Sequence, residues 1–96
     1  RTPASDADIT RVCTALDNAS FASDRTSVLQ QSMRNRCLTT DQARTILKRF
    51  SFESEKLEAA KYLYDRCSNP DDYFEINEEF SFSSTRDELN RYMNSR

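Results

Sequence analysis

The sequence predicts an all-α domain in which about six helices form three repeat-related pairs, a small helical repeat of the α-α superhelix type. The first observation behind this prediction is repetition: Ser-Phe recurs with its phenylalanine at positions 21, 52 and 82, and Phe-Ser-Phe occurs twice. A fixed period of about thirty residues is typical of repeat architectures. The second observation is that apolar residues recur every three or four positions, which is the period of an α-helix. No segment alternates apolar and polar residues for long enough to predict a β-strand.

Each predicted helix begins near a residue that suits a helix N-terminus. Thr39 with Gln42 matches a capping box, in which each side chain accepts a hydrogen bond from the other residue's N–H. Asn69 precedes Pro70, and proline suits the first helical position because its missing N–H has no partner there in any case. The expected starts lie near Asp6, Ser23, Thr39, Ser54, Asn69 and Ser84. The first helix illustrates the apolar faces, which carry Ile9, Val12, Cys13 and Leu16.

The chain contains no glycine. Helices often end with a glycine in the left-handed conformation, and asparagine is the usual substitute. We therefore expect Asn18, Asn35 and Asn69 to adopt that conformation.

Length and composition predict one domain. The 96 residues are near the common domain size, and 36% of them are hydrophobic. We interpret residues 1–5 as a linker remnant and residues 6–96 as a single helical repeat domain. No apolar run approaches the roughly 18 residues that a membrane span needs, so no membrane span is predicted.

The repeated six-residue segments resemble segments of a known protein family. They are Ser20-Phe21-Ala22-Ser23-Asp24-Arg25, Ser51-Phe52-Glu53-Ser54-Glu55-Lys56 and Ser81-Phe82-Ser83-Ser84-Thr85-Arg86, with the segment 56–64 between the last two. Across about residues 6–94 the chain resembles the domain of unknown function 4476 family, found in bacteria, often near the C-terminus of exported proteins, and in some eukaryotic proteins. The resemblance implies a small helical domain and no assigned activity or catalytic residues.

The repeated phenylalanines are predicted to be buried where one helical pair meets the next. These repeat-joint residues are Phe21, Phe50, Phe52, Phe80 and Phe82. A row of aromatic rings facing a ligand is the alternative. If Phe52 is buried, its truncation to alanine would cost about 3–5 kcal/mol.

A base follows each Ser-Phe word, at Arg25, Lys56 and Arg86. A cation near the start of a helix is disfavoured by the helix dipole, so each base is expected to have another partner. That partner is either a carbonyl or carboxylate of the domain itself or an anionic ligand.

Neither a cofactor nor a metal site is predicted. The chain has no histidine, no Cys-x-x-Cys pair and no Gly-rich loop. We expect Cys13, Cys37 and Cys67 to be buried free thiols, because equivalent positions in stacked repeats lie roughly 10 Å apart and a disulfide needs Cα atoms within about 7 Å.

The predicted function is non-catalytic protein–protein interaction within a larger protein, with another protein or a neighbouring domain as the partner. Tyr62 and Phe74 lie off the apolar stripes of their helices, and aromatic rings rimmed by charge are typical of interface hot spots. The expected contact residues are Tyr62, Asp71, Asp72, Phe74, Glu75 and Glu78. We place this surface opposite the phenylalanine joints, and packing of both rings against a neighbouring repeat is the alternative.

Two other functions are weighed. The basic cluster in residues 34–49 could bind nucleic acid, although a formal net charge of −2 disfavours this. Its bases are Arg34, Arg36, Arg44, Lys48 and Arg49. An enzyme is the weakest alternative, because no pair of reactive side chains has a telling spacing.

Overall fold

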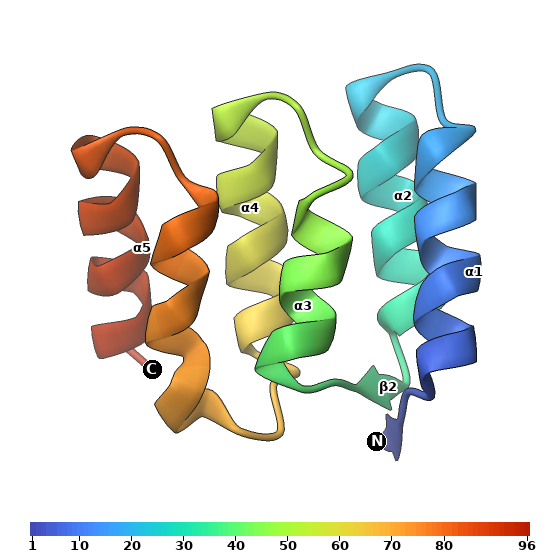
Figure 1. Ribbon diagram of the computed structural model, residues 1–96, viewed down its shortest axis with the longest axis horizontal. Helices are drawn as coiled ribbons and strands as arrows, with labels where there is room; N and C mark the ends of the chain where they lie inside the picture. Colours follow the sequence, from blue (N-terminus) through green and yellow to red (C-terminus); the bar gives the residue numbers. More distant parts are fainter.

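Two layers of helices make up the fold of the computed structural model, which describes all residues 1–96 (Figure 1). One layer contains α1 (Asp6–Asp17), α3 (Thr40–Leu47) and the 3-10 helix η1 (Pro70–Glu79). The other contains α2 (Ala22–Met33), α4 (Glu53–Tyr64) and α5 (Ser83–Asn94). The shortest dimension, 18 Å, is about the thickness of two helices packed together. The all-α class and the six helices are confirmed, and the relation of the pairs as repeats stays a prediction.

Side chains cap helices α1 and α3. Ser5 accepts a hydrogen bond from the Asp8 N–H at 3.0 Å, and the Asp8 carboxylate accepts one from the Ser5 N–H at 3.0 Å. Thr39 and Gln42 form the same reciprocal pair, as predicted. Each box satisfies two N–H groups at the helix start.

Helices α2, α4 and α5 begin earlier than the sequence predicts. The N-cap positions are occupied by Phe21, Phe52 and Phe82, all with extended backbone, and no side chain caps these helices. The caps expected from the sequence were the serines two positions later, Ser23, Ser54 and Ser84. Those predictions are wrong, because helical geometry begins directly after each phenylalanine and each serine already lies in the first turn.

Helix η1 has 3-10 geometry, with three residues per turn. This period places Tyr73, Ile76 and Glu79 on one line. Tyr73 and Ile76 are fully buried, and the Glu79 side chain is only 7% exposed. The inward face therefore contains a carboxylate that the α-helical period does not predict.

Residues 2–4 pack against the rest of the fold, and the interpretation of residues 1–5 as a linker remnant stays a prediction. Strand β1 (Thr2–Pro3) pairs in parallel with β2 (Arg36–Cys37), and Ala4 is buried. A similar contact follows in the next pair of helices, where Leu38 forms a parallel bridge with Cys67. These short pairings lie at the edge of the molecule that holds the N-terminus (Figure 1).

Twenty buried hydrophobic residues form one core between the layers. Tyr73 contributes its ring, which meets Tyr64 edge-on at 5.1 Å, and its hydroxyl donates to the Ala60 carbonyl at 2.6 Å. No residue has a positive φ, so the expected left-handed asparagines are not found. Asn18, for example, ends α1 at φ −85° with its N–H bonded to carbonyls of the last turn. None of the helices combines the length and the apolar character needed to cross a membrane.

Candidate functional site

Three of the five repeated phenylalanines are exposed. Phe50 and Phe80 are 4% and 5% exposed and belong to the core, as predicted. Phe21, Phe52 and Phe82 are 69%, 64% and 60% exposed, so the prediction of burial is wrong for them. The reason is their N-cap position: the chain turns there from the link into the helix, and the ring lies outside the layers. We call these three residues the phenylalanine edge.

The phenylalanine edge lies along one side of the molecule. The links that precede α2, α4 and α5 are all at the upper edge in Figure 1, opposite the N-terminus. The three helices run in parallel away from this edge. Because each phenylalanine has an extended backbone and is followed by a helix of the same direction, the three rings occupy equivalent places along the edge.

Free N–H groups accompany the rings. In α2, the first helical bond is donated by the Arg25 N–H to the Phe21 carbonyl at 3.0 Å, so the N–H groups of Ala22, Ser23 and Asp24 have no acceptor in the helix. Helices α4 and α5 begin in the same way, with first bonds to the phenylalanine carbonyls at 3.0 and 3.2 Å. A phenyl ring cannot accept these bonds as a serine cap would.

The repeated bases have partners within the domain. Arg25 binds Glu55 through two nitrogens, at 2.8 and 3.1 Å, and also donates to the Ala19 carbonyl at 3.3 Å. Lys56 donates to the Glu79 carbonyl at 2.9 Å, and Arg86 to the Phe80 carbonyl at 2.9 Å. The alternative of partners inside the domain therefore holds, and for Arg25 and Arg86 one partner is a carbonyl of the link just before their own helix.

A hollow of about 210 Å³ lies beside Phe52. Its lining comes from the end of α1, the link to α2, the first turn of α2 and the link between α3 and α4: Leu16, Asp17, Ala19, Arg25, Arg49, Ser51 and Phe52. Arg49 pairs with Asp17 at 3.1 Å across the hollow's rim. Phe52 and Ala19, from the link that precedes Phe21, thus both line this hollow.

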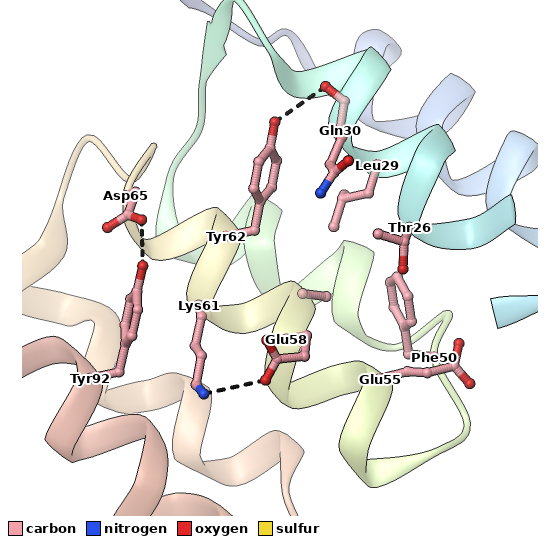
Figure 2. Close-up of a pocket in the computed structure, with 11 residues that line it drawn as sticks. Thr26, Leu29, Gln30, Phe50, Glu55, Glu58, Lys61, Tyr62, Asp65 and Tyr92 are labelled. Atoms are coloured by element: carbon pink, nitrogen blue, oxygen red, sulfur yellow. Dashed lines mark hydrogen bonds and ion pairs between the residues drawn. The ribbon is translucent and has the colours of Figure 1, made fainter. Parts of the chain in front are cut away.

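A second depression, of about 400 Å³, runs along α4 between α2 and α5 (Figure 2). We call it the α4 groove. Tyr62 lines it, donates its hydroxyl to the Gln30 carbonyl at 3.2 Å, and lies 3.8 Å from the Arg66 guanidinium. Tyr62 also packs against the core. Its ring is thus held on both sides by the domain.

Charges at the α4 groove are paired with one another. Lys61 binds Glu88 at 2.7 Å and Glu58 at 3.3 Å, and the hydrogen bond to Glu88 raises the pKa of Lys61. The Tyr92 hydroxyl donates to Asp65 at 2.5 Å, and burial followed by this bond raises the pKa of Tyr92. The groove therefore has an aromatic lining, and its charges have partners within the domain.

The predicted contact surface separates into two places. Phe74 is 63% exposed on η1, where Asp71, Asp72 and Glu78 are also exposed and Glu75 is half-buried. Tyr62, by contrast, lies in the α4 groove, which no residue of η1 lines. The structure therefore does not bring Tyr62 and Phe74 together, and the alternative of packing against the domain applies to Tyr62.

Glu79 joins η1 to α3. Its carboxylate accepts from Arg44 at 3.0 Å and from Lys48 at 2.9 Å. Burial alone would raise the pKa of Glu79, but the hydrogen bonds from Lys48 and Arg44 lower it below its usual value. These ion pairs of Glu79 are not predicted from the sequence, and their one signal there is the three-residue spacing of Glu79 from Ile76 and of Ile76 from Tyr73.

Comparison with known protein families gives a match over nearly the whole chain. A sequence model of the family described as domain of unknown function (DUF4476) matches residues 3–93. The chain belongs to the DUF4476 family. The resemblance drawn from the Ser-Phe words is thus confirmed, and the matched region begins within strand β1. Searches among curated proteins and among solved structures found no match.

Four of the five bases in the basic cluster of this DUF4476 domain form ion pairs, and the fifth, Arg34, is exposed without one. Arg36 binds Asp8 near the start of α1, whereas Arg49 binds Asp17 at its end. Arg44 and Lys48 are held by Glu79 on a third element. Because their charges are neutralised at separate places, these bases do not form the continuous patch that phosphate binding uses.

The cysteines of the DUF4476 domain are free. Cys13 is buried as expected, but Cys37 and Cys67 are half-buried. The expected separation of about 10 Å does not apply to Cys37 and Cys67, because Leu38 pairs directly with Cys67. Adjacent strand residues point to opposite faces, so the Cys37 thiol faces away from Cys67 and contacts the Arg1 carbonyl at 3.9 Å. No cluster of three metal-ligating side chains occurs.

Proposed function

We propose that this DUF4476 domain is a non-catalytic protein-binding module whose contact surface is the phenylalanine edge. The observation that carries this proposal is the exposure of Phe21, Phe52 and Phe82 at equivalent places along one edge. Single exposed apolar residues need no explanation, whereas grouped ones mark binding surfaces. Aromatic rings also dominate the binding energy of protein interfaces.

Two further observations support a binding role for this edge. The rings add little to the core, because two residues before Phe52 and Phe82 a second phenylalanine, Phe50 or Phe80, is already buried. The ring positions also leave three helices uncapped, although the same chain caps α1 and α3 with side chains. The predicted surface around Phe74 is a second exposed aromatic site, but it presents one ring only.

The proposal is tested by capture with a matched control. The test variant replaces all three edge rings with serine (F21S/F52S/F82S), which adds possible N-caps and so preserves the helices. The control is Phe74→Ser, which removes a ring of similar exposure from η1. We expect a partner from the source cell to be retained by the native domain and by F74S and to be lost by the triple variant, with all three domains folded by circular dichroism.

Two results would overturn the proposal. One is a partner that the triple variant retains as well as the native domain does. The other is loss of that partner with F74S alone, which would move the contact surface to η1. A crosslinking agent placed at Ser51, next to Phe52, adds a direct readout, because it should attach to the partner only when the edge is the interface.

A further inference from the structure

We propose that the α4 groove binds an extended segment of another protein that carries an apolar side chain and, close to it, a basic one. None of the three rings of the phenylalanine edge lines this groove, so the inference does not rest on the proposed function. Three features of the groove carry it: an apolar floor, an unbalanced negative charge and a length that matches a short stretch of chain.

The floor of the α4 groove is apolar. Leu29 from α2, Phe50 from the link before α4 and Ala59 from α4 line it, and they are 3%, 4% and 5% exposed. Figure 2 shows Leu29 and Phe50 on one side of the groove and Tyr92 on the other. An apolar cavity of about 150 Å³ already holds a benzene ring, so a groove of about 400 Å³ has room for an apolar side chain and its neighbours.

The ion pairs at the groove leave one negative charge over. Lys61 is the only base that lines the groove, and its ammonium is shared by Glu58 at 3.3 Å and Glu88 at 2.7 Å. The Glu58 side chain is 71% exposed and forms no other ion pair, so its charge is open to a ligand. The other two carboxylates of the lining are each paired with a base from outside the groove, Glu55 with Arg25 and Asp65 with Arg96.

The charge of the surrounding helices has the same sign. Residues 51–96, which include α4 and α5, hold six bases and eleven acids, a formal charge of −5. A surface of one sign attracts partners of the opposite sign and speeds their association. Arginine suits a carboxylate especially well, because its planar guanidinium can donate two parallel hydrogen bonds. The charge complementary to this groove is therefore that of a basic segment.

The length of the groove indicates a segment of chain. Its lining runs along α4 from Glu55 to Asp65, and ten residues of α-helix rise about 15 Å. An extended chain advances about 3.3 Å per residue, so about five residues span this length. On the α2 side, Thr26 and Gln30 line the groove with a hydroxyl and an amide, which can hydrogen-bond to the peptide groups of such a segment.

The order of side chains in the segment follows from α4. Ala59 of the floor directly follows Glu58, so the apolar surface and the open carboxylate are neighbours along the helix. In an extended chain every second side chain faces the same way. We therefore expect an apolar residue and a basic residue two positions apart.

The test uses a fluorescein-labelled peptide of five residues, with a leucine and, two positions later, an arginine among alanines. We expect saturable binding by fluorescence anisotropy, and about fivefold weaker binding to Glu58→Gln/Glu88→Gln, because two exposed ion pairs with the ligand are lost. The control Glu75→Gln/Glu78→Gln removes the same charge from η1 and should bind within about twofold of the native domain, since distant charges are screened. Lys61→Gln should bind more tightly, because it frees both carboxylates. Circular dichroism checks that each variant is folded.

Nitrogen–proton spectra locate the bound peptide. The side-chain amide of Gln30 and the backbone amides of Leu29 and Ala59 should shift on titration, while the backbone amides of η1 should not. The triple variant F21S/F52S/F82S should bind the peptide as the native domain does, because its rings lie outside the groove.

The remaining outcomes decide against the inference. A peptide that does not bind, or that binds Glu58→Gln/Glu88→Gln as tightly as the native domain, would show that the groove holds no basic segment. Equal binding of a peptide with alanine in place of the arginine would remove the role of charge. Equal binding of free arginine amide would make the ligand a small cation, and tighter binding of a helical peptide would make it a helix. Loss of the peptide in F21S/F52S/F82S would place it at the phenylalanine edge. Capture of a partner by that edge is measured separately, so the proposed function stands or fails on its own.

Discussion

The two phenylalanines of Phe50-Ser51-Phe52 give the sharpest test of the structure, because they are two residues apart and differ in burial. Phe50 is 4% exposed, so Phe50→Ala should lower the free energy of unfolding by about 3–5 kcal/mol, the range for a buried phenylalanine. Phe52 is 64% exposed, which leaves about a third of its surface buried. A third of the roughly 1.5–3 kcal/mol for a fully buried apolar side chain is about 0.5–1 kcal/mol, and this is the expected cost of Phe52→Ala.

Urea denaturation followed by circular dichroism at the helix band measures both variants. For a domain of this size, about 1 kcal/mol corresponds to a shift of about 4–8 °C in Tm, so thermal melts should separate the two clearly. Phe52→Ser provides a further check, because a serine N-cap contributes about 1 kcal/mol and should recover most of the loss. Equal losses for Phe50→Ala and Phe52→Ala would refute the assignment of one ring to the core and the other to the edge.

Three other measurements probe the interior. Because the ion pairs of Glu79 lower its pKa, the stability that this carboxylate contributes is fully present above its usual pKa of 4.5 and is lost as the pH falls below that value. The Glu79→Gln variant should therefore be less stable than the native domain at pH 7 and lose less stability on acidification. The control variant Glu78→Gln changes an exposed side chain and should behave as the native domain. Tyr73→Phe removes the hydroxyl that donates to Ala60 and should cost about 1 kcal/mol in urea denaturation; no loss would mean that this hydrogen bond contributes nothing. Thiol titration of denatured, unreduced protein should count three free cysteines, and a count of one would reveal a disulfide.

The helices could be predicted because their apolar faces are periodic. Thr39 and Gln42 also fixed the start of α3, since the residues of a capping box are local in sequence. The links have no such period. Phe50 continues the apolar spacing of Ala43, Ile46 and Leu47, which indicates that it faces the core. No such spacing includes Phe52, and its exposure depends on how the link turns between the two layers.

Other features depend on contacts between distant residues. The pairing of Thr2–Pro3 with Arg36–Cys37 has no pattern of its own, because two-residue strands are too short to alternate. The burial of Glu79 follows from the 3-10 geometry of η1, which a sequence with helical apolar spacing does not reveal. Of the candidate contact residues, Phe74 is exposed, as a binding residue must be. Tyr62 is instead held by Gln30, which is 32 residues away in sequence, and by Arg66, and the sequence does not reveal either contact.

The absence of positive φ angles has a consequence for the unfolded chain. Every turn between the helices is made by residues with side chains, in conformations open to any L-amino acid. Glycine loses more backbone freedom on folding than any other residue, so a chain without it starts from a narrower unfolded ensemble. Part of the stability of this domain therefore comes from the stiffness of its unfolded state, which no contact in the folded structure displays.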